Sequence, residues 1–278
     1  MQLRNLFAAC MWLLLVCSCY ISWTVGAAKA EKIQNLDKRI PFIMAHRGGT
    51  RVTPENTLAA FEKALSLGVN IELDIRLTKD NVIVVIHDKS VDRTTNGKGI
   101  VADMNLSKIK TLDAGSYLSR EYAGESIPTL EQVFVQFSSK APANVIMSID
   151  TKVENAKMFE KLVELLDRYH LFDRTFIEVS NAQIASTIQR LDSRVRFAVW
   201  APSESVLNTA LKTPYFERIH TTASLAKWTD AAHAAGKAII PLVHTKQHWQ
   251  EVKCYNIDGI NTNHPFIMKK LNDRRVRN

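Results

Sequence analysis

The chain has 278 residues and a formal net charge of +8, with 46% hydrophobic and 23% charged residues. This composition is that of an ordinary globular protein, and the length allows one large α/β domain or two small ones. The positive charge suits anionic partners such as phosphates, nucleic acid or a membrane surface, or simply a solvated basic surface. Of the 4 cysteines only Cys254 follows residue 30, which excludes a zinc site of the CxxC or Cys/His type.

Residues 1–30 have the layout of a secretory signal peptide. An early arginine is followed by an apolar run over residues 6–16 and then by small residues, so cleavage is expected near Ala27 or Ala30. Two alternatives stay open, an uncleaved N-terminal anchor and a lipoprotein lipidated at Cys19. We therefore expect an exported protein that is periplasmic or secreted.

Residues 39–278 are predicted to form one domain in which short strands alternate with amphipathic helices. The strand-like runs lack clean polar alternation, as expected of strands that are buried on both faces. Eight strands of this kind predict an α/β fold, the TIM (β/α)8 barrel, with a doubly wound open sheet as the competing architecture. The predicted core strands are residues 42–45, 71–77, 145–150, 175–179, 196–200, 218–221, 238–243 and 259–262.

A further apolar run at residues 82–87 follows the strand at 71–77 after only four residues. Because so short a connection cannot hold a crossover helix, the two runs are predicted to form an antiparallel hairpin that adds an extra strand. A two-residue Asp-Asn loop would place Asp74 directly across from His87, whereas one extra loop residue would reverse the face. Residues 88–128 then form a small insertion, which we expect over the mouth of the barrel.

Carboxylates are predicted to gather at the ends of the strands. Glu72 and Asp74 lie two residues apart on one predicted strand, so their side chains share a face. A polar outer face would be the ordinary explanation of this spacing alone, but a divalent cation would also relieve the repulsion between the two acids. Asp150 ends another core strand and Lys152 follows on the same face, which favours a charged cluster at the barrel mouth.

His46 and His87 each end an apolar run, and each is followed by a charged residue. Two imidazoles near a metal ion suit acid–base catalysis at phosphorus, where one accepts a proton from the attacking oxygen and the other donates one to the leaving alkoxide. Arg47 offers a planar fork to phosphate oxygens, and Lys152 adds a point charge. The other histidines are interpreted as surface or partly packed residues: His170, His220, His233, His244, His248 and His264.

The chain contains, in this order, the blocks HRGGTRVTPENT, ELDIRLTKDNVIVVIHD, DRTTNGKG, IPTLEQV, the strand ending in IDTK, and DGINTNHP. Together these blocks resemble the glycerophosphodiester phosphodiesterase family. The resemblance covers nearly all of the chain after the leader and implies a TIM barrel of the phospholipase-C-like type. It also implies metal-dependent hydrolysis of glycerophosphodiesters to sn-glycerol 3-phosphate and an alcohol.

The resemblance implies a role for individual positions and one divalent cation, Mg²⁺ or Ca²⁺. The implied metal ligands are Glu72, Asp74 and Asp150. The implied acid–base pair is His46 and His87. The implied phosphate-binding residues are Arg47 and Lys152. The implied supporting residues of the first loop are Asn56 and Glu55, of which the second could also be a ligand.

The sequence departs from the family pattern at three places. Asp150 stands where a glutamate is usual, so its carboxylate is one methylene short. AIIPLVHT stands where the family has a strand with a tryptophan that ends in an asparagine, so residues 241–244 are expected to line the alcohol side of the pocket. NTNHP stands where TDxP is common, and Asn263 has therefore lost a charge. These changes leave the alcohol of the substrate open.

We expect a small-molecule phosphodiester or a lysophospholipid as substrate, with peripheral membrane contact as a further option. No nucleic acid partner is expected, because basic and aromatic residues are not interleaved. A lysophospholipase D-like or other phosphodiester specificity is one alternative. Another is a barrel that binds a phosphorylated ligand without turnover, although simple capture needs no acid–base pair.

Overall fold

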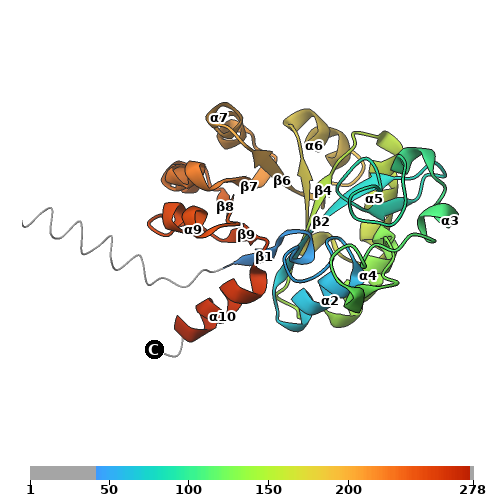
Figure 1. The fold of residues 1–278 in the computed structure, drawn as a ribbon. Helices are drawn as coiled ribbons and strands as arrows, with labels where there is room; N and C mark the ends of the chain where they lie inside the picture. The colour runs from blue at the N-terminus through green and yellow to red at the C-terminus, as the bar shows by residue number, and fades with distance from the viewer. Residues whose placement is uncertain (1–41, 276–278) are drawn as a thin grey trace, which may run out of the picture.

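The computed structural model describes residues 42–275, and Figure 1 shows their arrangement. The predicted signal peptide, with its cleavage and lipidation alternatives, lies outside these residues. Within the described part of the chain, no helix combines the length and the apolar character that a membrane crossing requires.

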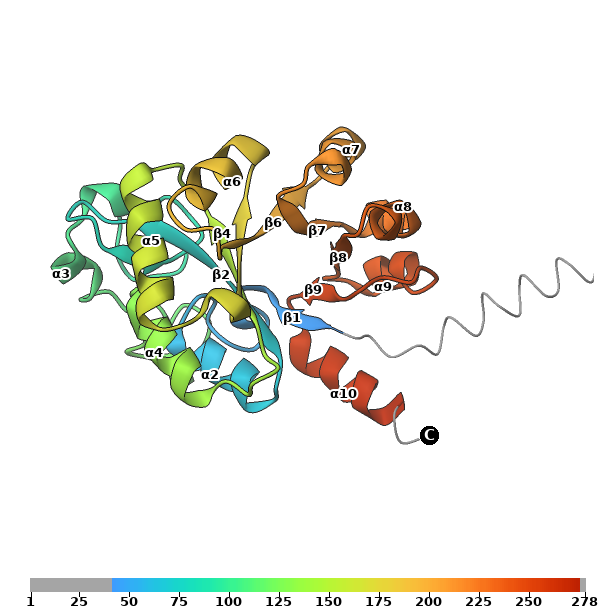
Figure 2. The ribbon, with the colours of Figure 1, turned by 180° about the vertical axis from the view of Figure 1, so that it is seen from behind.

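Eight parallel strands close into the TIM barrel that the sequence predicts, and helices surround them (Figures 1 and 2). The order around the ring is β1-β9-β8-β7-β6-β5-β4-β2, and β1 pairs with β2 to close it. All the predicted core strands are present, with ends that agree to within two residues. They are β1 (Ile43–Ala45), β2 (Asn70–Leu77), β4 (Met147–Thr151), β5 (Thr175–Val179), β6 (Arg196–Ala201), β7 (Phe216–Thr222), β8 (Ala238–Leu242) and β9 (Ile260–Thr262).

The helices cover the outer face of the barrel, and several of them bury an apolar stripe against it. In α5, for example, Met158, Leu162 and Leu166 recur every four residues and are buried. Polar side chains mark several starts, as where Thr129 and Gln132 form a capping box at α4. The helices are α2 (Leu58–Ser66), α4 (Leu130–Lys140), α5 (Ala156–Arg168), α6 (Ala182–Gln189), α7 (Glu204–Lys212), α8 (Thr229–Ala234), α9 (Lys246–Val252) and α10 (Pro265–Arg275). Shorter 3-10 turns are η2 (His46–Gly48), η5 (Phe172–Arg174) and η6 (Ala223–Trp228).

The main apolar core lies between the barrel strands and these helices. Alternate residues of β2, such as Leu73 and Ile75, point outward into this core and are fully buried. The residues between them, Glu72 and Asp74, therefore face the barrel interior. This alternation places the carboxylates where the sequence predicts them.

Strand β3 (Ile83–Val85) pairs antiparallel with β2, as the sequence predicts, but the predicted register is wrong by one residue. Ile86, rather than His87, lies opposite Asp74, and its backbone N–H donates to the Asp74 carbonyl oxygen at 2.9 Å. The connecting loop contains three residues instead of two, and the last of them, Asn81, has a φ of 60°. A three-residue loop of this kind ends in a left-handed residue and shifts the pairing by one.

The insertion after β3, residues 88–128, has a small apolar core of its own. Val101, Ile109 and Leu112 pack there against Val84 and Ile86 of the hairpin. Its short helical elements are η3 (Val101–Asp103), α3 (Leu106–Ile109) and η4 (Arg120–Tyr122).

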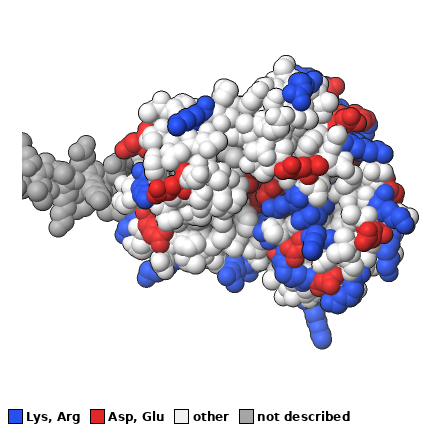
Figure 3. All heavy atoms as spheres, turned by 90° about the horizontal axis from the view of Figure 1, so that it is seen from above, with Lys and Arg blue, Asp and Glu red and all other residues white. Residues whose placement is uncertain are grey.

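Two tyrosines of the insertion contact the loop that follows β1. The Tyr117 hydroxyl accepts a hydrogen bond from the Glu55 N–H at 2.9 Å, and the Tyr122 hydroxyl donates to the Val52 carbonyl oxygen at 3.1 Å. The insertion is therefore tied by hydrogen bonds to the loop that presents His46 and Arg47. On the side of the molecule that carries the insertion, lysine and arginine are interspersed with aspartate and glutamate (Figure 3).

Candidate active site

The loop after β1 presents His46 and Arg47 through an unusual backbone. Arg47 has a φ of 53°, and Gly48 and Gly49 follow with φ values of 83° and 104°. A Cβ added to Gly48 would lie 2.6 Å from the Cβ of Ala60 in α2, which is too close for any side chain. Glycine therefore lets the loop turn tightly against α2 and aim the two preceding side chains at the barrel mouth.

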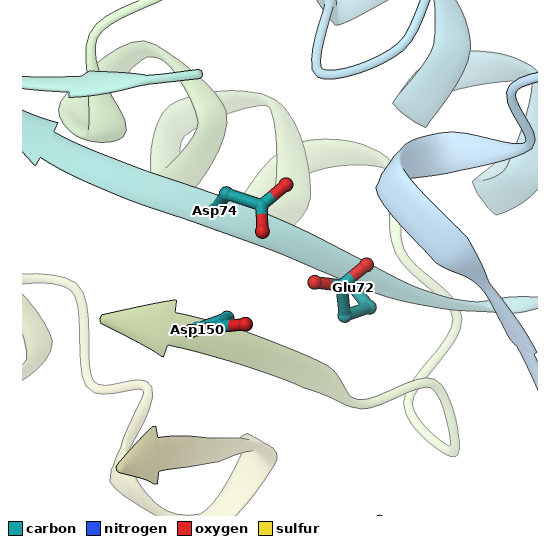
Figure 4. Close-up of side chains that lie close together, drawn as sticks. All are labelled: Glu72, Asp74 and Asp150. Atoms are coloured by element: carbon teal, nitrogen blue, oxygen red, sulfur yellow. The ribbon is translucent and has the colours of Figure 1, made fainter. Parts of the chain in front are cut away.

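Glu72, Asp74 and Asp150 come together from β2 and β4, and Figure 4 shows their carboxylates pointing toward one another. Asp74 and Asp150 are direct partners in the parallel register, and one oxygen from each of the three acids lies within 4.8 Å of the others. Burial and the charges of its two neighbours raise the pKa of Glu72 well above its usual range. Burial and the charge of Glu178 raise the pKa of Asp150 to about 7. Such crowded, buried carboxylates could hold a metal ion, because a hard cation removes their mutual repulsion.

Two cations border this acidic cluster. Lys152 Nζ lies 3.1 Å from Asp74 Oδ1 and 2.5 Å from Asp150 Oδ2. The Arg47 N–H donates to Glu72 Oε2 at 2.7 Å, and Arg47 Nε lies 3.3 Å from Asp74 Oδ2. Burial opposes the ionisation of Asp74, but the charges of Lys152 and Arg47 outweigh it and lower the pKa of Asp74. The structure thus places both predicted phosphate-binding cations beside the predicted metal ligands.

His46 is half-buried, and its Nδ1 lies 2.7 Å from Asn263 Oδ1. Because an amide oxygen can only accept, this contact places the ring proton on Nδ1 and leaves Nε2 as an acceptor. Burial and the charge of Arg47 lower the pKa of His46 to about 4. The imidazole is therefore neutral at pH 7 and able to accept a proton. Sequence reasoning noted only the lost charge at Asn263 and missed this contact.

His87 lines the same cavity as His46 although it does not pair with Asp74. Strand β3 ends at Val85, so strand alternation no longer decides which way His87 points. Its Nδ1 lies 2.7 Å from Asp88 Oδ1. Burial lowers the pKa of His87, while the charges of Asp74 and Asp88 oppose this effect.

Asn56 and Glu55 hold the first loop in place. Asn56 is buried with a φ of 58°, its Nδ2 donates to Asp74 Oδ2 at 2.8 Å, and its Oδ1 accepts from the Asp74 N–H at 3.3 Å. Glu55 accepts a hydrogen bond from Arg47 Nη1 at 3.0 Å. It also accepts two from Arg93, each at 2.8 Å, a contact that the sequence does not reveal.

Replacing Asn56 by alanine is expected to destabilise the protein by about 2–4 kcal/mol. The change removes two hydrogen bonds to a buried carboxylate residue and puts an alanine in the left-handed region. Asn56→Gly removes the same side-chain hydrogen bonds, but glycine adopts the left-handed conformation without strain. It should therefore destabilise the protein by about 1 kcal/mol less than alanine does. Denaturant unfolding of both variants measures the difference, and equal stabilities would show that the backbone conformation plays no part.

The cavity at the barrel mouth has a volume of about 500 Å³. The predicted wall at residues 241–244 is only half correct, because strand alternation turns Leu242 and His244 into the cavity and buries Pro241 and Val243 in the outer core. Further lining residues that sequence reasoning missed in this role are Trp200, His220, Glu178 and Asn261.

His220 is not a surface or partly packed residue, as its sequence context suggested. Its ring is 2% exposed, and its Nδ1 contacts the carboxylate of the buried Glu178. Ala198 lies on β6, between β5 and β7, and is paired with Glu178. Its small side chain leaves room for Glu178 and His220 to meet over it. Burial opposes the ionisation of Glu178, but the charge of His220 outweighs it and lowers the pKa of Glu178. A glutamate within the apolar run TFIEV was the signal in the sequence.

The fold is a TIM barrel, and its mouth gathers carboxylates, imidazoles and basic side chains. This combination defines a candidate metal-assisted phosphate site. The chain belongs to the glycerophosphoryl diester phosphodiesterase family, whose model matches residues 46–266. The match confirms the family resemblance seen in the sequence.

Curated relatives and solved structures agree with this assignment. A glycerophosphodiester phosphodiesterase of Caldanaerobacter subterraneus subsp. tengcongensis is 40% identical over 161 residues, which span 56% of this chain and 65% of that protein. One from Bacillus altitudinis is 29% identical over 239 residues, which span 83% of this chain and 98% of that protein. The match with the first relative therefore covers just under two thirds of its length.

Two solved structures share the fold. The glycerophosphodiester phosphodiesterase from Agrobacterium tumefaciens has a TM-score of 0.72 and 27% identity, covering 83% of this chain and all of that one. A phosphodiesterase from Oleispira antarctica, solved with the product sn-glycerol-3-phosphate, has a TM-score of 0.74 and 23% identity. It covers 86% of this chain and 98% of its own, and at this identity it supports the fold alone.

Proposed function

We propose that this protein is a metal-dependent phosphodiesterase that hydrolyses glycerophosphodiesters to sn-glycerol 3-phosphate and a free alcohol. The observation that carries the proposal is that a cluster of three carboxylates lies at the cavity that two imidazoles line. Both imidazoles have Nδ1 held by a polar partner, which leaves each Nε2 for proton transfer. Family membership and the names of the relatives support the same activity.

Glu72, Asp74 and Asp150 would hold one divalent cation, for which we propose Mg²⁺ or Ca²⁺. The donor set consists of carboxylate oxygens, which hard cations prefer. When bound, such a cation supplies polarisation of a phosphoryl oxygen and lowers the pKa of a nearby hydroxyl. Arg47 and Lys152 would bind further phosphate oxygens, since both border the carboxylates.

The two histidines would transfer protons in two successive steps. In the first, the neighbouring glycerol hydroxyl attacks phosphorus and gives its proton to Nε2 of His46, while the leaving alcohol takes a proton from Nε2 of His87. In the second, water opens the cyclic phosphate and the histidines exchange roles. The lowered pKa of His46 keeps it neutral and supports its role as the first acceptor. Burial also lowers the pKa of His87, and the hydrogen bond to Asp88 opposes this effect.

A product assay tests this function and its alternatives. The protein is incubated with glycerophosphocholine in Mg²⁺, in Ca²⁺ or in excess chelator, and free glycerol 3-phosphate is measured. Metal-dependent release supports the proposal. Turnover of lysophosphatidylcholine alone would replace it with a lysophospholipase D-like specificity. Binding of glycerophosphocholine without turnover of any phosphodiester would leave a phospho-ligand-binding barrel.

We further propose that the protein is exported to the periplasm or secreted, because residues 1–30 have the layout of a signal peptide. N-terminal sequencing of the protein recovered from cell fractions tests this. A start at residue 28 or 31 supports cleavage, whereas a blocked, lipid-bearing Cys19 or an intact leader supports the alternatives.

A further inference from the structure

Arg93, a residue of the insertion, joins two carboxylates that belong to different loops. Its Nη1 and Nη2 donate to Glu55 Oε2 and Oε1, both at 2.8 Å. Its Nε and Nη2 donate to Asp88 Oδ2 and Oδ1, at 2.7 and 3.0 Å. One planar guanidinium thus makes four charge-assisted hydrogen bonds in a geometry that fixes both partners.

Asp88 also contacts His87, a proposed catalytic residue. Its Oδ1 lies 2.7 Å from His87 Nδ1. The hydrogen bonds from Arg93 hold the pKa of Asp88 well below its usual range, so this carboxylate is ionised and accepts the Nδ1 proton. Asp88 therefore fixes both the tautomer and the orientation of the imidazole, provided that it is itself held still.

Glu55 is anchored in the first loop. Glu55 is 8% exposed and accepts a hydrogen bond from Arg47 Nη1 at 3.0 Å, while its backbone N–H donates to Tyr117. His87 lies beyond the end of β3, and its backbone is held by a hydrogen bond from Arg76 Nε of β2 to its carbonyl oxygen at 2.8 Å. The Asp88 carboxylate, which contacts the His87 ring, is held from the first loop through Arg93.

We propose that Arg93 is a positioning residue that anchors Asp88 to Glu55 and thereby fixes His87 for proton donation to the leaving alcohol. The inference rests on the proposed function for its kinetic consequence. Arg93 is 47% exposed, and ion pairs at such sites add little to stability. A contribution to folding alone would therefore leave turnover nearly unchanged.

The kinetic test compares two substrates that differ in the alcohol released. Glycerophosphocholine needs a proton donor for its alkoxide, whereas glycerophospho-p-nitrophenol releases a stable phenolate. Arg93→Ala is expected to slow alcohol release in a single turnover about 10- to 100-fold for the first substrate, as for other residues that orient a functional group. For the second substrate the loss should be at least about 10-fold smaller. Arg93→Lys keeps the charge without the planar fork and should fall between Arg93→Ala and wild type.

Two comparisons separate positioning from general loosening. In an Asp88→Ala background, Arg93→Ala should reduce the rate of alcohol release by less than about a further 3-fold, because the arginine acts through that carboxylate. Arg194→Ala is the matched control, since Arg194 also joins two aspartates, Asp192 and Asp167, at similar exposure but outside the cavity. It should leave both substrates unaffected. Equal losses on both substrates, or a fully additive double variant, would overturn the proposal.

A measurement that needs no turnover distinguishes the positioning role of Arg93 from the proposed function of the protein. The Nδ1–H resonance of His87, assigned by its disappearance in His87→Gln, should be protected in the wild type and in Arg194→Ala but exchange-broadened in Arg93→Ala. If the wild type hydrolyses neither substrate while this difference is present, the proposed function fails and the positioning stands. If the resonance is the same in all three proteins, the positioning fails whatever the activity.

Discussion

Replacing His46 or His87 by alanine is expected to lower kcat for glycerophosphocholine by about 10²- to 10⁴-fold, the range that a positioned acid or base contributes. Each imidazole has its Nδ1 bound to a polar partner, at 2.7 Å in both cases, and lines the cavity that holds the carboxylates. Alanine removes the proton acceptor or donor but leaves the carboxylates in place. Steady-state kinetics measures the loss, and calorimetric titration checks that the metal still binds.

His233→Ala is the matched control for these two variants. His233 also contacts an aspartate, with its Nε2 2.9 Å from Asp258 Oδ2, but it lies on α8 outside the cavity. We expect it to retain wild-type kcat. If it loses as much activity as His46→Ala, the loss reflects damage to the fold, and retention of activity in either cavity variant would remove that histidine from the mechanism.

The pH dependence of kcat/KM should also reflect the pKa of His46. A proton acceptor works in its neutral form, so activity is lost as the pH falls through its pKa. Burial lowers the pKa of His46 to about 4, and the acid limb of kcat/KM should therefore lie well below 6.5, the value of an unperturbed histidine. An acid limb at 6.5 or above that is missing in His46→Ala would contradict this assignment.

The barrel strands could be predicted from the sequence because burial on both faces leaves a clear apolar run. The hairpin register could not, because it depends on whether the loop uses two or three residues. Asn81 adopts the left-handed conformation that completes a three-residue loop, and many asparagines in turns do not. The predicted pairing of Asp74 with His87 was wrong for this reason, although His87 still lines the cavity and the charge of Asp74 still acts on its pKa.

The residues at the cavity mouth followed from local patterns, such as two acids on one strand or a histidine at a strand end. Contacts between distant segments did not. Glu178 and His220 are 42 residues apart and meet over the small side chain of Ala198 on the intervening β6, and Arg93 reaches Glu55 across 38 residues. The spacing of residues along the sequence does not indicate long-range contacts of this kind. A buried charge within an apolar strand, as at Glu178, signals that a partner exists but does not identify it.

Removing one carboxylate from the acidic cluster is expected to have the largest effect of all. Glu72→Gln and Asp74→Asn each remove a ligand charge, and we expect kcat to fall on the order of 10³-fold or more, because a metal ion stabilises the transition state by several kcal/mol. Asp74→Asn should be the more severe, since Asn56, Arg47 and Lys152 all contact this carboxylate.

The same variants should lose the stabilisation that a bound cation gives to the folded chain. In the wild type, Mg²⁺ or Ca²⁺ at 100 times its Kd should raise the free energy of unfolding by about 2.7 kcal/mol. Glu217→Gln is the control, because Glu217 also lies on a barrel strand but forms an exposed ion pair with Arg196 away from the cavity. It should keep the full metal effect. A wild type that neither cation stabilises, and whose turnover survives excess chelator, would show that these carboxylates serve no metal. Proton sharing within the cluster would then account for the raised pKa values of Glu72 and Asp150.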